Sequence, residues 1–297
     1  MKTQNLLMAA FCILISVSCG PRTDKEYLSD VLQKMNKVES VSYKVVRQAW
    51  LPGEKDPVYT ITSEVYEHIN PQDTAIGSSF VEFQDNAFRG VYDGKVSSYV
   101  YEEEGEKWIR EDDFTTKSPL PFRMVMPEFF YYTQSILKYA ITTQDSIELS
   151  LKDLGDDYLM ELTIHMPVQV EFFGKARYMP QNPYVYDPTS VYKIWISKKD
   201  DMPYRYRREM EGNMNEASCS DFIYNPVDKE CIVATNYYPE GFEIVKKRQR
   251  SSKPTVDMTG KKAPDWTLTD MKGQKVSLSG IKSKVILLQF TGIGCGP

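Results

Sequence analysis

Cysteine is the residue type in this sequence that offers the most chemistry. The chain of 297 residues holds five cysteines and only two histidines, His68 and His165. Two histidines leave little for histidine-based catalysis or a multi-histidine metal site, and we expect no metal, nucleotide or flavin cofactor. Thiols can form disulfides, exchange them through a thiolate or carry a modification. The positions of the cysteines therefore decide which of these reactions to consider.

Cys19 directly follows an apolar segment at the N-terminus. Residues 6–17 are apolar apart from Ser16, and this run is shorter than the roughly 20 residues of a spanning helix. We interpret residues 1–18 as an export signal. The stretch Ser16-Val17-Ser18-Cys19-Gly20 resembles the lipobox of bacterial lipoproteins, with Ser16 where that pattern usually has Leu. The resemblance implies a lipid on Cys19, a tether over residues 19–23 and a lipid-anchored protein on the extracytoplasmic side of a membrane in the cell envelope. The alternative is an ordinary signal peptide cut near Ser18, with Cys19 incidental.

Cys219 and Cys231 lie on either side of Asn225-Pro226-Val227-Asp228, which is a plausible turn. A turn centred at residue 225 would place the two cysteines opposite each other, whereas a turn centred nearer 226 and 227 would stagger them. A disulfide and two free buried thiols therefore both stay open. The spacing is not that of a CxxC metal or redox motif.

The composition favours a compact body with an aromatic-rich β core. Hydrophobic residues make up 41% and charged residues 26% of the chain, with 20 Tyr and 13 Phe, as in globular proteins. The net charge of −5 and the absence of a long basic stretch make nucleic acid an unlikely partner.

Residues 24–247 have the pattern of an α+β domain. A capping-box spacing at Thr23 opens an amphipathic helix, and a second helical pattern spans residues 127–140. The rest alternates with period two, including hairpins that turn at Asp93-Gly94, at 153–156 and at 198–203. About ten strands and two helices predict a curved antiparallel sheet wrapping one or two helices.

This order of elements resembles the LolA-like fold of lipoprotein carriers and sensors. Tyr92-Asp93-Gly94-Lys95, and residues 192–198 leading to Pro203, resemble the "DGK" and "iwID…P" stretches of that group. The resemblance implies an unclosed half-barrel around a helix, with an apolar cavity for acyl chains or another hydrophobic ligand. The alternative is that the apolar stripes only fill a core, so we name no ligand-contacting residue.

Residues 259–297 form a separate module after a linker at 248–258. Two short strands joined by a Lys-Gly turn are expected near its start, and the apolar run 284–290 is typical of a central buried strand. The module resembles the opening of TlpA/ResA-type thioredoxin-like (redoxin) domains, through Gly260-Lys261-Lys262-Ala263-Pro264-Asp265-Trp266 and the closing Cys295-Gly296-Pro297. That resemblance implies that Cys295 is a nucleophile towards protein thiols or disulfides, because a helix N-terminus after the strand lowers the pKa of a thiol.

The module departs from its family at the end. The resolving cysteine would stand at position 298, and Gly294 replaces the Trp that usually precedes the first cysteine. The 38 residues from Gly260 to Pro297 are fewer than the roughly 100 of a closed domain. We expect the chain as given to be inactive in dithiol exchange and interpret it as a fragment, with deliberate truncation or a natural early stop as alternatives. The main prediction is an exported lipoprotein of the thiol-disulfide oxidoreductase class. The alternative prediction is a LolA-like protein that binds a lipid, a lipoprotein or another hydrophobic ligand.

Overall fold

The structure is a computed structural model, and it describes residues 22–103, 105–114, 125–182, 185–226, 231–246, 259–270 and 272–287. The chain divides into two compact units, Met1–Arg248 and Gln249–Pro297. Cys19 and Cys295, the predicted lipidation site and the predicted nucleophile, both lie outside the described residues.

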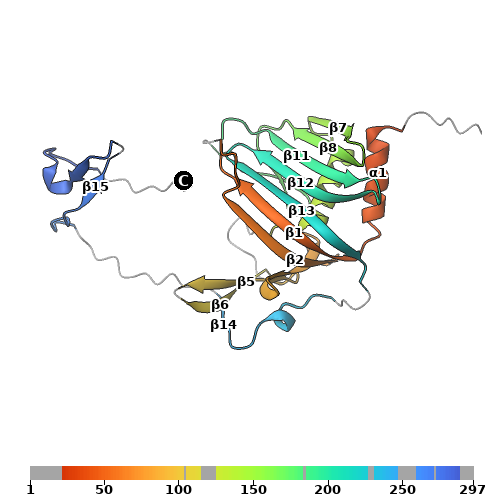
Figure 1. Cartoon of the computed structure of the whole chain (residues 1–297), viewed down its shortest axis with the longest axis horizontal. Coiled ribbons are helices and arrows are strands. Elements are labelled where there is room, and N and C mark those ends of the chain that lie inside the picture. The colour runs from red at the N-terminus through yellow and green to blue at the C-terminus, as the bar shows by residue number, and fades with distance from the viewer. Residues whose placement is uncertain are drawn as a thin grey trace, which may run out of the picture. The chain divides into compact units, whose positions relative to one another are not determined.

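The first unit is built on one curved sheet (Figure 1). Its described strands follow the order β14-β6-β5-β4-β3-β2-β1-β13-β12-β11-β8-β7, and every neighbouring pair is antiparallel except β14 with β6. The order is linear, with β14 and β7 at its two ends, so the sheet is unclosed as expected. The strands are β1 Ser40–Trp50, β2 Tyr59–Ile69, β3 Ser78–Gln84, β4 Ala87–Tyr92, β5 Val96–Glu103, β6 Glu106–Asp113, β7 Ile147–Asp153, β8 Asp157–Ile164, β11 Ser190–Ser197, β12 Met202–Met210, β13 Asn213–Tyr224 and β14 Glu243–Val245.

Helix α1 (Asp24–Met35) begins where the capping box predicts. The Thr23 hydroxyl accepts a hydrogen bond from the Glu26 N–H, and the Glu26 carboxylate accepts one from the Thr23 N–H. These two bonds satisfy N–H groups that the first turn of a helix leaves free. The buried face of the helix consists of Tyr27, Leu28, Val31 and Met35.

Helix α2 (Phe129–Thr142) packs with α1 against the inner face of the sheet. It buries nine of its fourteen residues. Strand β11 alternates strictly, because Tyr192, Ile194 and Ile196 are buried and their neighbours are half-exposed. The inner face of the sheet and the two helices thus form one continuous apolar core.

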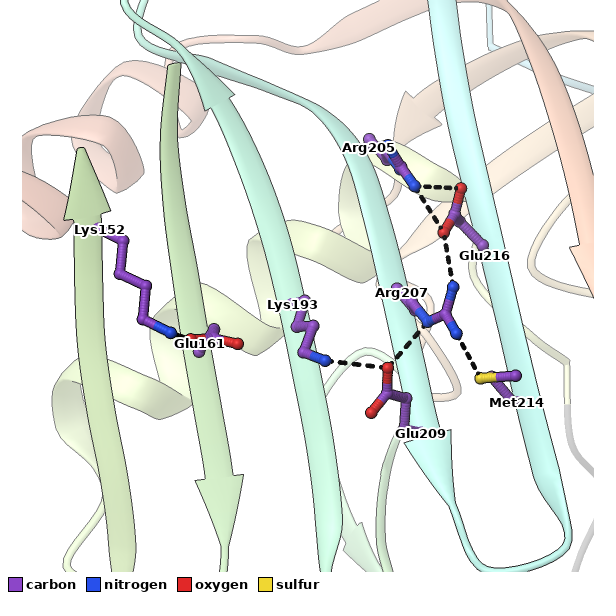
Figure 2. Close-up of polar contacts among 8 residues, drawn as sticks. All are labelled: Lys152, Glu161, Lys193, Arg205, Arg207, Glu209, Met214 and Glu216. Atoms are coloured by element: carbon purple, nitrogen blue, oxygen red, sulfur yellow. Dashed lines mark hydrogen bonds and ion pairs between the residues drawn. The ribbon is translucent and has the colours of Figure 1, made fainter. Parts of the chain in front are cut away.

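The outer face of the same strands is polar. Figure 2 shows its side chains pairing between β7 and β8, between β11 and β12, and between β12 and β13. Each ion pair on a solvated face contributes little stability. These side chains therefore mainly keep the outer face hydrophilic. The pairs are Lys152 with Glu161, Lys193 and Arg207 with Glu209, and Arg205 and Arg207 with Glu216.

The local hairpin predictions are confirmed. Strands β4 and β5 pair across Asp93-Gly94, β7 pairs with β8, and β11 pairs with β12. Gly94 has a φ of +88°, a backbone conformation that glycine adopts without a steric penalty. Two short strands outside the predicted set, β9 (Val170–Phe172) and β10 (Ala176–Tyr178), form a small sheet of their own.

The second unit contains the predicted pair of short strands, β15 (Thr267–Thr269) and β16 (Lys275–Ser277). The predicted central strand over 284–290 is wrong for the described part of that run. Residues 284–287 form no strand, and Val285 and Leu287 are 85% and 92% exposed. A central strand needs a partner on each side, and in the described residues of this unit only β15 and β16 pair. A thioredoxin-like domain is therefore not formed by the part of the unit that the structure describes.

Candidate ligand-binding cleft

Strands β12 and β13 part from each other in the middle of the sheet. Their pairing runs from Met210 opposite Asn213 to Arg205 opposite Ser218, and it ends there. Strand β12 nevertheless starts three residues earlier, at Met202, and β13 continues to Tyr224. Residues 202–204 and 219–224 are therefore neighbours that do not pair with each other.

Three local features explain why the strands separate. Pro203 has no N–H and cannot donate a hydrogen bond to a neighbouring strand. Opposite Tyr43, β13 carries an extra residue, because Ser42 pairs with Ile223 and Lys44 with Ser220, and Asp221 in this bulge has a φ of +56°. Bulges bend a strand and increase its twist. The register of β12 against β11 also shifts, between Trp195 and Ile196.

The separation leaves a cleft of about 330 Å³. Its inner wall is shared with the core, since Met202 and Cys219 belong to the core cluster and Phe222 and Tyr224 pack against it. Carboxylates stand among the remaining lining residues. The full lining is Asp157, Ser197, Asp200, Met202, Pro203, Tyr204, Cys219, Phe222 and Tyr224.

Aromatic rings make the wall on the β13 side. The rings of Phe222 and Tyr224 are stacked, with centroids 5.6 Å apart and an interplanar angle of 9°. Behind them lies the start of α2. The ring centroids of Phe129 and Phe222 are 6.1 Å apart, and those of Phe130 and Tyr224 are also 6.1 Å apart. An apolar group in the cleft would therefore contact the aromatic side chains that join the sheet to α2.

The polar groups of the cleft are incompletely paired. The Tyr204 hydroxyl donates to the Asp157 carboxylate at 2.8 Å. The Tyr224 hydroxyl oxygen is buried and has no hydrogen-bond partner among the described residues. Burial, with smaller contributions from Asp200 and Cys219, raises the pKa of Tyr224 above its ordinary value. The hydroxyl is therefore neutral and available as a donor or an acceptor.

The structure holds Cys219 and Cys231 as free thiols. Cys219 is buried in β13 opposite Val45, whereas Cys231 is exposed and lies outside any strand. The strand that a 219–231 hairpin would need is not formed at residues 231–233, because β13 pairs with β1 and β12 instead. Burial raises the pKa of the Cys219 thiol well above its ordinary value, with the nearby Glu67 as the next cause.

Cys219 is expected to react with iodoacetamide at least about tenfold more slowly than Cys231 at pH 7.5, because its thiol is buried and forms little thiolate. Peptide mass spectrometry after timed labelling of the folded chain measures both rates. In urea the two rates should converge. Equal rates in the folded chain would contradict the buried position of Cys219.

A buried polar cluster lies behind the cleft, where β1, β2 and β3 meet α2. The Glu67 carboxylate accepts hydrogen bonds from the Tyr43 hydroxyl and from the N–H groups of Phe130, at 2.8 Å, and Tyr131, at 3.3 Å. It thus caps the start of α2 from a neighbouring strand. Burial raises the pKa of Glu67 to about 8, against the lowering effect of these hydrogen bonds.

Arg47 holds the other two acids of this cluster. Its guanidinium donates to Glu82 at 2.7 Å and to Glu128, the residue immediately before α2. Burial raises the pKa of Glu128, and Arg47 opposes that rise. The cluster therefore ties the start of α2 to two strands through charged groups.

A second buried pair joins Arg208 of β12 to Glu171 of β9. Glu171 also accepts hydrogen bonds from the hydroxyls of Tyr132, at 2.7 Å, and Tyr192, at 3.2 Å. Three donors, two from the sheet and one from α2, thus converge on one carboxylate.

Among the cleft and cluster residues, Cys219 alone was predicted from the sequence as a candidate site residue. One signal was available, because Arg47 and Glu67 stand at inward positions of alternating strands, two residues after Val45 and Val65. A charge at an inward position predicts a buried partner, although it does not identify that partner.

Neither a metal centre nor a membrane-spanning helix is found in the described residues. No three of their His, Cys, Asp or Glu side chains are grouped so that they could hold a metal ion. None of their helices is long and apolar enough to cross a membrane.

Comparison with known proteins finds similarity only among solved structures. No protein-family profile matches the chain, and no curated protein matches it. Among the similar structures is the lipoprotein LppX of Mycobacterium tuberculosis, 9% identical over 69% of this chain and 99% of that chain, with a TM-score of 0.31. LprF of Mycobacterium bovis is 10% identical over 68% and 93%, with a TM-score of 0.33. A LolA superfamily protein of Nitrosomonas europaea is 9% identical over 71% and 97%, with a TM-score of 0.22.

The main functional prediction, a thioredoxin-like thiol-disulfide oxidoreductase, is wrong. Among the similar structures named above, one is described as a lipoprotein and one as a LolA superfamily protein, and none is described as a thioredoxin-like protein. In the described part of residues 259–287 the only strand pairing is that of β15 with β16. Thiol or disulfide partners gain no support from these findings.

Proposed function

We propose that the first unit binds a hydrophobic ligand, the acyl chain of a lipid or of a lipoprotein, in the cleft between β12 and β13. The observation that carries the proposal is that core residues form the wall of an open cleft, so that a ligand can contact the core without unfolding the sheet. The cleft volume of about 330 Å³ lies in the range of small-molecule sites, about 300–1,000 Å³.

The predicted lipid on Cys19 supports the same function. A lipid anchor five residues before α1 would keep the binding unit beside a membrane, in the cell envelope, where acyl chains are concentrated. The anchor and the cleft are separate parts of the proposal, since the cleft is formed by residues far along the chain from Cys19.

Titration of the full chain with N-phenyl-1-naphthylamine, an uncharged apolar probe whose fluorescence rises in apolar surroundings, tests the proposal. Cys219→Phe fills part of the cleft and is expected to weaken binding at least about tenfold, whereas Cys231→Phe makes the same exchange at an exposed position and is expected to have no effect. Wild-type protein provides a second measurement, because bound ligand should slow alkylation of Cys219 and leave that of Cys231 unchanged. Binding that is equal in both variants, together with unprotected Cys219, would overturn the proposal.

A further inference from the structure

We infer that the cleft between β12 and β13 selects an amphiphile with an ammonium group, which it holds between the carboxylates of Asp157 and Asp200 and the rings of Tyr204, Phe222 and Tyr224. This inference rests on the proposed function and names the chemical class of its ligand. It follows from the charges, rings and unpaired hydroxyl of the cleft.

The two carboxylates of the cleft, those of Asp157 and Asp200, have few partners among the described residues. In the part of the chain that the structure describes, neither Asp157 nor Asp200 forms an ion pair. Among these residues the Asp157 carboxylate accepts a hydrogen bond only from the Tyr204 hydroxyl. The Asp200 carboxylate accepts one only from the backbone N–H of Met202, at a long 3.4 Å.

A lysine beside Asp200 serves other groups. Lys34 of α1 donates to the backbone carbonyl of Asp200 at 2.5 Å and lies 3.8 Å from the carboxylate of Asp201. Asp201 also accepts the Tyr27 hydroxyl at 3.0 Å. The charge of Lys34 is thus offset by Asp201, and the two carboxylates that line the cleft remain as an acidic rim.

The aromatic wall suits the same ligand. The face of an aromatic ring attracts a cation, and ammonium groups are recognised by several rings together with a carboxylate. The stacked rings of Phe222 and Tyr224 stand on one side of the cleft and Tyr204 stands on the other strand. Aliphatic carbons next to the ammonium group would meet Met202 and Pro203.

The buried hydroxyl of Tyr224 is an independent sign of a missing polar partner. A buried hydroxyl without a hydrogen bond is costly, and such groups in native proteins call for an explanation. An N–H donor of a primary ammonium group in the cleft would satisfy it. An anionic headgroup would instead meet Asp157 and Asp200, and the repulsion between like charges would oppose its binding.

Calorimetric titration of the full chain with dodecyltrimethylammonium, dodecylamine, dodecyl maltoside and dodecyl sulfate, each as monomers, tests the inference. The two cationic probes are expected to bind at least about tenfold more tightly than the sulfate. The double variant Asp157→Asn/Asp200→Asn should abolish this preference. The double variant Asp85→Asn/Asp112→Asn removes the same charge from β3–β6, at the other end of the sheet order, and should keep it. Tetramethylammonium, which has no chain, should bind far more weakly than the dodecyl cations.

The outcomes separate the inference from the function beneath it. Equal affinity for all dodecyl probes, or a cationic preference that survives in Asp157→Asn/Asp200→Asn, would overturn the ammonium site and leave apolar binding intact. A failure of every dodecyl probe to bind would overturn both. If tetramethylammonium binds as tightly as the dodecyl cations, the ligand is a small cation without an alkyl chain. That result would overturn the inference that the ligand is an amphiphile.

Discussion

Replacing Arg47 with methionine is expected to lower the free energy of unfolding by about 3–5 kcal/mol, the range found when one partner of a buried ion pair is removed. The substitution leaves the carboxylates of Glu82 and Glu128 close together, largely buried and without a cation. Methionine retains much of the aliphatic volume, so the effect measures the lost charge more than lost packing. Urea unfolding of the full chain, followed by far-UV circular dichroism, gives the value.

A surface arginine provides the matched control. Arg110 pairs with Asp112 on β6, but both side chains are substantially exposed, at 51% and 39%. Arg110→Met is therefore expected to change stability by less than about 1 kcal/mol. The loss in free energy of unfolding caused by Arg47→Met should also shrink as the pH falls towards 4, because protonation neutralises the unpaired carboxylates of Glu82 and Glu128. Equal effects of the two variants would show that Arg47 is not a buried partner of the two acids.

The location of Arg47 makes this more than a test of one ion pair. Glu128 stands immediately before α2, and Glu82 lies on β3, so Arg47 on β1 fixes the start of the helix against two strands. Phe129 and Phe130 follow directly and support the aromatic wall of the cleft. Loss of Arg47 should therefore loosen the wall as well as the helix, and faster alkylation of Cys219 would report it.

Elements defined by neighbouring residues were predictable from the sequence. The capping box at Thr23 and the alternation of Tyr192, Ile194 and Ile196 act within a few residues, so the sequence carries the whole signal. The turn at Asp93-Gly94 is of the same kind. The general form of the sheet follows from many such local patterns, which is why an unclosed sheet with two helices could be expected.

The cleft depends on pairings between distant residues and could not be predicted in this way. Pro203 and the bulge at Asp221 are each modest local signals, and they matter because β12 and β13 are neighbours at that point. Cys219 illustrates the same limit. The sequence suggested a nearby partner, Cys231 across a local turn, whereas the residue opposite Cys219 in the sheet is Val45, 174 positions earlier. The apolar run at 284–287 has the local pattern of a strand but forms none, because no neighbouring strand pairs with it among the described residues.

Wild-type protein is expected to lose stability as the pH rises from about 5 to 8, and Glu67→Gln should lose less. The pKa of Glu67 in the folded chain is about 8, above its ordinary value of 4.5, with burial as the main cause. Between these values the folded state keeps a proton that the unfolded state releases. The free energy of unfolding therefore falls through this window, by up to about 1.4 kcal/mol per pH unit, and no further fall from this group occurs above pH 8.

Urea unfolding at several pH values between 5 and 8.5 measures the two slopes. Glu67→Gln carries no proton to lose, so its stability relative to wild type should rise with pH across the window. Glu64→Gln is the matched control, because Glu64 lies on the same strand with its side chain exposed, and its slope should follow that of wild type. An unchanged slope in Glu67→Gln would mean that Glu67 is ionised in the folded chain. In that case α2 would begin at a buried charge, and the hydrogen bonds from Tyr43, Phe130 and Tyr131 would be strong enough to outweigh the cost of burial.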